Sequence, residues 1–383
     1  MSFVDIADLT SLEISPPVAR CHPGRTRWQA ELIDREYRRS LHFESDAFSD
    51  DAKSIPLRPF AMAALPIAMR RAKPLRIPGR LDVGSYRNLL EWQWAMAAWH
   101  PGKLHVVPLH VEVVPAAERP TVANSATAFS GGVDSCYTAV RYSQDEEYRR
   151  RLEYPLSAGI MVHGMDIPLG GNGAVQFEGA FARSRTILAS LKLEALSVAT
   201  NARELNADEG VAWGTAAHGI LIASAMACFE DRFSQILIPS TYAYAHLKTP
   251  WASHPATDPL FSSSLVSYLH DGAHANKLDK VDVVSSHSAV CEQLRVCWSG
   301  PRHDSNCGHC FKCVATQACF WLAGVEAPPA FGSPANLDEL ATAPLTNKQN
   351  RYLFLYMLAA ARGRSRLDIA NALALALRRP TNQ

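Results

Sequence analysis

Short apolar runs alternate with longer amphipathic stretches from residue 124 onward. This order is typical of a parallel sheet whose strands are joined by crossover helices. We therefore expect an α/β fold with a parallel five-stranded sheet and flanking helices. The apolar runs predict strands at 126–129, 156–162, 195–199, 235–239 and 281–285. After the third strand, small apolar residues predict a long helix that packs closely on the sheet, with Asn206 as its N-cap.

The segment before this pattern predicts a small α+β domain. Residues 104–114 are rich in β-branched side chains, and Pro108 among them suits an edge strand or a bulge. Residues 85–100 predict a helix capped by Ser85. Large apolar residues recur along this helix at spacings of three and four, which is typical of a buried face: Leu89, Trp92, Met96 and Trp99. The tail from about residue 346 predicts a helical hairpin split near Gly363.

These patterns divide the chain into four predicted parts: residues 1–120, 121–290, 291–325 and 326–383. The first is the α+β domain, the second the sheet domain, the third a cysteine-rich module and the fourth a helical segment. A chain of 383 residues with 48% hydrophobic content can bury a large core.

Charge and hydropathy argue against a strongly basic nucleic-acid-binding protein, a membrane-spanning protein and a secreted protein. The formal net charge is +1, so no global field attracts nucleic acid or an anionic membrane, and any polyanion needs a local site. No stretch approaches the roughly 20 apolar residues of a spanning helix, and the first residues carry acids where a signal peptide carries bases. We expect a cytoplasmic protein without membrane contact.

The string SGGVDS at residues 130–135 follows a predicted strand and begins a predicted helix. Two glycines allow a tight turn whose N–H groups point inward, and the helix N-terminus adds positive potential. Such a loop can bind a phosphate chain without the lysine of a Walker A motif. The alternative is a strand-to-helix turn in which the glycines serve geometry alone.

This string resembles the PP-loop of the ATP pyrophosphatase superfamily, which cleaves ATP between its α and β phosphates to adenylate an oxygen, with Mg²⁺. The resemblance implies that ATP and Mg²⁺ bind here, with Asp134 close to the pyrophosphate or to the metal. It implies catalytic roles for Ser130, Asp134 and Ser135. It also implies that the whole loop contacts the nucleotide: Ser130, Gly131, Gly132, Val133, Asp134 and Ser135.

Polar residues that follow the other strands would complete such a site, because ligands of open parallel sheets lie at the carboxyl ends of strands. His163 and Asp166 follow the second strand and are candidates for the adenosine pocket or for metal. The long loop 246–264 is a candidate lid or substrate loop. Candidate substrate residues are Ser240, Thr241, Tyr242, Lys248, His254 and Asp258. Ordinary turn residues are the alternative at each position.

Four cysteines cluster late in the chain, separated by nine, two and two residues: Cys297, Cys307, Cys310 and Cys313. Four thiolates can surround one tetrahedral Zn²⁺, and four protein ligands are typical of a structural site. A redox pair or an iron–sulfur cluster uses similar spacing and stays open. We expect the other cysteines to pack as small hydrophobic residues.

A PP-loop followed by a four-cysteine cluster resembles the 7-cyano-7-deazaguanine synthase family, over about residues 124–325. The resemblance implies adenylation of a deazapurine carboxylate such as 7-carboxy-7-deazaguanine, then nitrogen transfer from ammonia or a protein amine to give an amide or nitrile. It also implies a structural zinc and a homodimer. Three features depart from the family: the N-terminal segment has no counterpart, the first cysteine gap of nine residues is slightly long, and Thr316 stands where an arginine is favoured.

The profile as a whole is similar to that of synthase-like proteins in bacterial defence systems, and this resemblance implies a protein partner recognised by the N-terminal segment. Its basic stretch could contact an acidic surface, or could be a solvated face: Arg70, Arg71, Lys73, Arg76 and Arg80. Two other functions stay open. One is tRNA nucleoside thiolation with the cysteines as sulfur carriers, and the other is a non-catalytic nucleotide-binding subunit.

Overall fold

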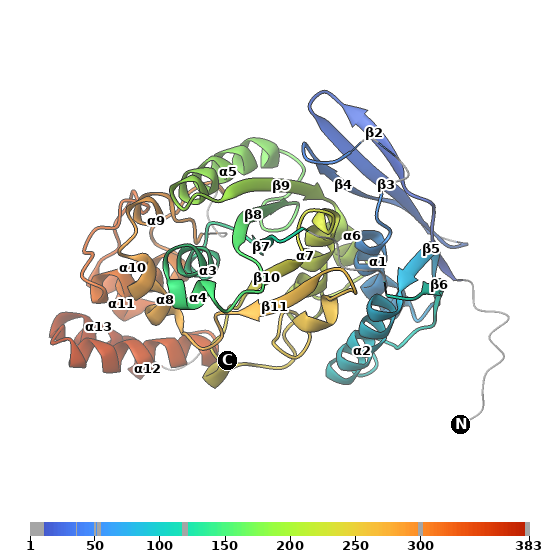
Figure 1. Cartoon of the computed structure of the whole chain (residues 1–383). Coiled ribbons are helices and arrows are strands. Elements are labelled where there is room, and N and C mark those ends of the chain that lie inside the picture. Colours follow the sequence, from blue (N-terminus) through green and yellow to red (C-terminus); the bar gives the residue numbers. More distant parts are fainter. Residues whose placement is uncertain are drawn as a thin grey trace.

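A single 11-stranded sheet is the framework of the molecule. The computed structural model describes residues 11–35, 37–49, 51, 55–116, 122–297 and 302–379. The strands are β1 (Leu12–Ile14), β2 (Val18–His22), β3 (Arg25–Ile33), β4 (Arg38–Ser45), β5 (Leu75–Asp82), β6 (Leu109–Val114), β7 (Ser125–Ala128), β8 (Leu156–His163), β9 (Glu194–Thr200), β10 (Gln235–Pro239) and β11 (Ser267–Asp271). Their order is β11-β10-β7-β8-β9-β4-β3-β1-β5-β6, with β2 paired to β3 (Figure 1).

The α/β class is confirmed, but the five-stranded sheet is wrong, because the sheet has 11 strands and is mostly parallel. Strands β7, β8, β9 and β10 lie where apolar runs predict them. The predicted strand at 281–285 is wrong, since those residues fall in or directly after helix α8 (Lys277–Val284). Asn276 and Asp279 form a capping box that starts this helix, and Val281 and Val284 are buried at helical spacing. The strand beside β10 is instead β11.

The six N-terminal strands, β1 to β6, join the parallel strands β7 to β11 through the pairing of β4 with β9. Strand β4 pairs antiparallel with β9, with Phe43 opposite Thr200. The Asn201 side chain accepts a hydrogen bond from the His42 N–H at 3.0 Å and donates one to the Ser40 carbonyl at 2.7 Å. The sheet therefore continues from the parallel strands into the N-terminal segment. The predicted boundary near residue 120 lies at residues 117–121, outside the described ranges, and the four-part division stays a prediction.

Helices cover both faces of the sheet (Figure 1). In β10, Leu237 packs into one hydrophobic cluster and its neighbours Ile236 and Ile238 into another, as expected for a strand buried on both faces. The helices are α1 (Arg58–Arg71), α2 (Val83–Trp99), α3 (Val133–Gln144), α4 (Glu146–Arg149), α5 (Gly173–Ser190), α6 (Ala202–Asp208), α7 (His218–Met226), α8, α9 (Ser288–Gln293), α10 (Phe311–Leu322), α11 (Leu337–Thr342), α12 (Lys348–Gly363) and α13 (Leu367–Arg378).

Two predicted helix caps are wrong. Helix α2 is capped by Asp82, whose carboxylate accepts the Ser85 N–H, while Ser85 lies inside the helix. Asn206 lies within α6 and donates hydrogen bonds to the carbonyls of Ala63 and Ala202, so it anchors α6 to α1 instead of starting a helix. The predicted buried stripe of α2 is confirmed at three positions: Leu89, Trp92 and Met96.

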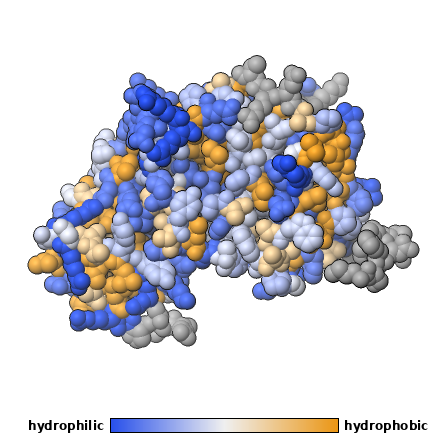
Figure 2. Space-filling model, turned by 60° about the horizontal axis from the view of Figure 1, so that its bottom comes forward, coloured by the Kyte–Doolittle hydropathy of each residue, from blue (hydrophilic) through white to orange (hydrophobic). Residues whose placement is uncertain are grey.

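The predicted C-terminal hairpin is confirmed as α12 and α13, with α12 ending at Gly363. Several large apolar side chains of this hairpin reach the surface: Tyr352, Leu355, Tyr356, Leu367 and Leu375. Figure 2 shows hydrophobic and hydrophilic areas mixed at this end of the molecule. Among the described residues, no helix has the length and apolar character to cross a membrane.

Candidate functional site

The SGGVDS loop is a fixed turn between β7 and the first turn of α3. Gly131 has a φ of +73°, in the left-handed region that favours glycine. The Ser135 hydroxyl accepts the Ser130 N–H at 3.3 Å and donates to the Gly132 carbonyl at 3.1 Å, and the Gly132 N–H donates to Ser130 Oγ at 3.3 Å. The loop's own hydroxyls therefore set its shape at the positive end of α3.

A buried lysine from a distant helix reaches this loop. Lys280 of α8 is 1% exposed, and its ammonium donates to Asp134 Oδ1 at 2.7 Å and to the Ser240 carbonyl at 2.5 Å. It thus ties the first turn of α3 to the end of β10. The sequence analysis missed this residue because 281–285 was assigned to a strand. A lysine on the buried face of an amphipathic helix, in register with Val281 and Val284, is the signal that marks it.

A buried arginine lies on the other side of the loop. Arg295 is 5% exposed, and its guanidinium donates to the Ser130 carbonyl at 3.3 Å and to the His303 carbonyl at 3.0 Å. One of its terminal nitrogens is 3.5 Å from Asp166 Oδ2, and its backbone N–H donates to the Gly131 carbonyl at 2.9 Å. Within the described ranges, the Nε of Arg295 has no hydrogen-bond partner although it is buried. A spare guanidinium donor beside the loop suits an anionic ligand.

A third cation, Lys312 in the first turn of α10, lies at the surface of the same region. Loss of solvent around its ammonium lowers the pKa of Lys312, and the positive charge of Lys277 acts in the same direction. The negative charges of Asp166 and Asp134 oppose this shift. The loop contains no lysine, yet the tertiary structure surrounds it with positive charge from α8, α10 and the segment before Cys297.

The four predicted cysteines gather into one group. All four Sγ atoms lie within 4.8 Å of one another: Cys297, Cys307, Cys310 and Cys313. Three of the sulfur–sulfur distances are 3.5, 3.8 and 3.9 Å. A tetrahedral site with Zn–S bonds of about 2.3 Å has sulfur–sulfur edges of about 3.8 Å. The group could therefore bind a metal such as zinc.

The cysteine group and the loop 130–135 are connected through two short segments, 294–297 and 310–313. Asn306 accepts the N–H groups of Val296 and Cys297 at 2.8 and 3.2 Å, and it donates to the Leu294 carbonyl at 2.8 Å. This fixes the strand-like segment that carries both Arg295 and Cys297. Lys312 lies between Cys310 and Cys313 in sequence, so the cysteine group also positions this third cation.

The end of β10 leads into an aromatic cluster that contains two predicted substrate residues. The ring centroids of Tyr242 and Trp251 are 5.0 Å apart, and the Lys248 ammonium is 4.2 Å from the Trp251 centroid. The ring centroid of His218 is 4.9 Å from that of Trp251. Loss of solvent lowers the pKa of Lys248, whereas burial, aided by the charge of Asp134, raises the pKa of Tyr242. The sequence analysis did not single out Trp251 or His218.

Two other predicted site residues, Asp258 and His163, make buried contacts with neighbouring elements. Asp258 is fully buried and accepts hydrogen bonds from Ser253 Oγ at 2.7 Å, the His254 N–H at 3.0 Å and His270 Nδ1 at 2.7 Å. His163 lies against Phe177 with ring centroids 4.4 Å apart, and burial lowers its pKa.

The structure therefore brings the loop 130–135, Asp166, Ser240, Tyr242 and Lys248 toward one region, and it leaves Asp258 and His163 in packing contacts. Thr241 is exposed beside Tyr242. The functional roles of all these residues stay predictions.

The basic stretch of the N-terminal segment is largely paired within the chain. Arg71 and Lys73 both contact Asp34 at 2.7 Å. Arg76 contacts Glu13 and Arg80 contacts Glu112, each at 3.1 Å. Much of its charge is thus balanced locally.

Comparisons with protein-family models, with curated proteins and with solved structures find no match to this chain.

Proposed function

We propose that this protein binds ATP at residues 130–135 and transfers AMP to a carboxylate, releasing pyrophosphate. The observation that carries the proposal is the buried Lys280, whose ammonium is bonded to Asp134 in the first turn of α3. Together with Arg295 and Lys312, it gives the loop the positive charge that its own sequence lacks. Burying a lysine costs free energy, and a buried charge beside a loop at the end of a parallel sheet is a functional-site candidate.

The proposed reaction begins with attack of a carboxylate oxygen on the α-phosphorus of ATP. The bond from this phosphorus to the oxygen bridging to the β-phosphorus breaks, and pyrophosphate leaves with the electron pair. Negative charge grows on the leaving group, so the loop N–H groups and Arg295 act by electrostatic stabilisation. Mg²⁺ prefers oxygen ligands, and the partly exposed carboxylates of Asp134 and Asp166 would hold it.

Nitrogen transfer follows in this proposal. Ammonia, or an amine of a protein partner, attacks the acyl carbon of the adenylate and displaces AMP, which leaves an amide and a released proton. With ammonia as donor, a second ATP adenylates the amide oxygen and releases pyrophosphate and one proton from the nitrogen. Loss of AMP and the other nitrogen-bound proton then gives a nitrile. With a protein amine as the nucleophile, the product is a partner protein that carries the acid as an amide. We propose that such a modification serves anti-phage defence.

The acceptor that fits the neighbouring cluster is a planar acid. Tyr242 and Trp251 provide aromatic faces for stacking, and the Lys248 ammonium provides a partner for a carboxylate. The resemblance of the loop and cysteine spacing to 7-cyano-7-deazaguanine synthases supports 7-carboxy-7-deazaguanine as this acid. We also propose that the four cysteines bind structural zinc; their mutual proximity favours one tetrahedral ion over separate sulfur carriers.

The test is to incubate the purified protein with Mg-ATP and 7-carboxy-7-deazaguanine, with and without ammonium, and to follow AMP, pyrophosphate and the base by mass spectrometry. We expect AMP and pyrophosphate to depend on the acid, and the amide or nitrile to depend on ammonium. Ser130→Ala should lower AMP formation at least tenfold, while Ser190→Ala, in α5, should not. Release of ADP and phosphate, or ATP binding without turnover on any carboxylate tested, contradicts the proposal.

A further inference from the structure

A single π-helical turn, Trp213–Ala217, leads into α7 beside the aromatic cluster that follows β10. Here the His218 N–H donates to the Trp213 carbonyl, five residues back, where an α-helix would bond four residues back. Such turns are rare and occur frequently at functional sites. This one places His218, the first residue of α7, with its ring centroid 4.9 Å from that of Trp251.

The loop 246–264, which contains Trp251, is attached to this turn through its backbone. The Ala252 N–H donates to the Gly214 carbonyl at 3.2 Å. A Cβ added at Gly219 would lie 2.0 Å from the Ala252 carbonyl oxygen, so the first turn of α7 and the loop are in direct contact. Trp251 and the start of α7 therefore keep a fixed position relative to each other.

One ring nitrogen of His218 has a fixed hydrogen-bonding role. Its Nδ1 lies 3.2 Å from the Trp213 carbonyl oxygen, and because a carbonyl can only accept, Nδ1 carries the proton of this bond. In the neutral imidazole the other nitrogen, Nε2, then holds a lone pair. Among the residues that the structure describes, none forms a hydrogen bond with Nε2, and His218 is only partly buried. This lone pair is therefore available to a ligand.

The surroundings of the ring bear on its protonation. Loss of solvent lowers the pKa of His218, whereas two backbone carbonyls of the π-helical turn and the negative charges of Asp258 and Asp166 oppose this shift. Asp166 is also 3.5 Å from the guanidinium of Arg295, beside the loop 130–135. The ring of His218 thus lies within the electrostatic field of the proposed ATP site.

Two cations lie over the aromatic rings next to His218. The Lys248 ammonium is 4.2 Å from the centroid of the Trp251 ring, and the Arg203 guanidinium is 4.3 Å from that of the Trp213 ring. Positive charge near an imidazole disfavours its protonated form. Together with the loss of solvent, these cations favour a neutral His218 at neutral pH.

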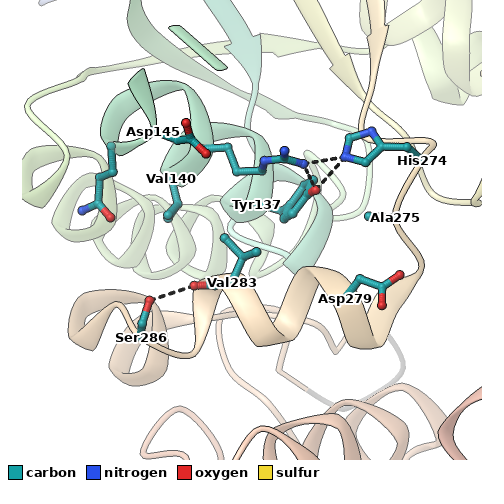
Figure 3. A pocket seen from close by; sticks show the side chains of 10 residues that line it. Tyr137, Val140, Asp145, His274, Ala275, Asp279, Val283 and Ser286 are labelled. Carbon is teal, nitrogen blue, oxygen red and sulfur yellow. Dashed lines mark hydrogen bonds between the residues drawn. The ribbon is translucent and has the colours of Figure 1, made fainter. Parts of the chain in front are cut away.

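Two other histidines close to the carboxyl end of β11 are placed differently. The Nδ1 of His270 contacts Asp258 at 2.7 Å, and its Nε2 is closed off from solvent. Figure 3 shows His274 in a separate cavity between α3 and α8, where its Nε2 lies 2.9 Å from the Tyr137 hydroxyl. Of the three histidines, His218 is the one whose ring lies in the aromatic cluster.

We propose that His218 is the general base of the nitrogen-transfer step, a role that rests on the proposed adenylation. The amine nitrogen attacks the acyl carbon of the adenylate and so acquires a positive charge. His218 Nε2 accepts one proton from this nitrogen. The bond from the acyl carbon to the phosphate oxygen breaks, and AMP leaves with the electron pair. The imidazolium then releases its proton to water, which restores the neutral base.

The test separates adenylation from nitrogen transfer. Exchange of labelled pyrophosphate into ATP in the presence of 7-carboxy-7-deazaguanine measures adenylation, and mass spectrometry of the amide formed from ammonium measures the complete reaction. General-base catalysis contributes about 10²- to 10⁴-fold, so we expect His218→Asn to lower amide formation about 100-fold or more. Exchange should stay within threefold of wild type, because asparagine keeps a donor near the position of Nδ1 for the Trp213 carbonyl.

His100→Gln is the matched control. The Nε2 of His100 lies 3.0 Å from the carbonyl oxygen of Thr215, in the same π-helical turn, and His100 is also partly buried. Its ring nitrogen is thus already engaged by the turn that precedes His218. Neither exchange nor amide formation should change more than threefold in this variant.

Hydroxylamine distinguishes a base from a residue that only shapes the site. It is largely unprotonated at neutral pH and attacks acyl adenylates without a general base, so His218→Asn should still form the hydroxamate at close to the wild-type rate. Loss of both hydroxamate and exchange in this variant, or amide formation within threefold of wild type, overturns the role of His218. No exchange in the wild-type protein contradicts the proposed adenylation itself, and the role of His218 with it.

Discussion

Replacing Lys280 by methionine separates the binding of nucleotide from the stability of the fold. Methionine keeps the length and the apolar stem of lysine but removes the ammonium that donates to Asp134 and Ser240. A hydrogen bond to a charged group contributes about 1.5–3 kcal/mol. Since 1.4 kcal/mol is tenfold in affinity, loss of one such bond to a phosphate weakens ATP binding about 10- to 150-fold.

We expect Lys280→Met to change the free energy of unfolding less than it changes the free energy of ATP binding. Removing one partner of a buried ion pair is severe when the other charge stays buried. Here the Asp134 side chain is 32% exposed, so water can solvate its carboxylate when Lys280 is gone. The desolvation cost of the ammonium also disappears. We therefore expect the free energy of unfolding to change by only about 1–2 kcal/mol.

The assay pairs two measurements on each variant. Calorimetric titration with a non-hydrolysable ATP analogue gives the affinity, and urea denaturation followed by circular dichroism gives the free energy of unfolding. Lys348→Met, at an exposed position in the first turn of α12, is the control and should change neither quantity. A Lys280→Met protein that folds normally and binds the analogue within threefold of wild type would refute the assignment of Lys280 to the phosphate site.

Three further predictions follow from local geometry. Cys310→Ser should release the metal and lower the melting temperature, while Cys21→Ser should do neither; metal content and thermal denaturation measure this, and a stable metal-free variant contradicts it. Gly131→Ala should lower stability by about 1–2 kcal/mol, because an alanine at φ +73° is strained, whereas Gly170→Ala has open space and should cost much less in the same urea assay. Burial lowers the pKa of His42 to about 4. The unfolded state therefore binds more protons between about pH 4 and 6.5, so stability should fall as pH decreases through that window. Denaturation series at several pH values should give a flatter dependence for His42→Gln, and an unchanged slope contradicts the assignment.

The sequence alone determined features whose residues are close together in the chain. The loop at 130–135 is specified locally by two glycines and by two serines that bond within it, and distant residues such as Arg295 add further bonds. The cysteine group is similar, because two of its gaps are two residues long and its four Sγ atoms lie within 4.8 Å of one another. Apolar runs identified β7 to β10 because central parallel strands are buried on both faces.

Tertiary structure decided the features that depend on distant segments. Strand β11 contains serine, histidine and aspartate, so its composition does not mark it as a strand, and pairing with β10 creates it. Likewise, the pairing of β4 with β9 extends the sheet into the N-terminal segment. Lys280 and Arg295 lie more than 140 residues after the loop that they contact. Their placement as buried cations beside the loop comes from tertiary contacts, which exist only once the chain is folded.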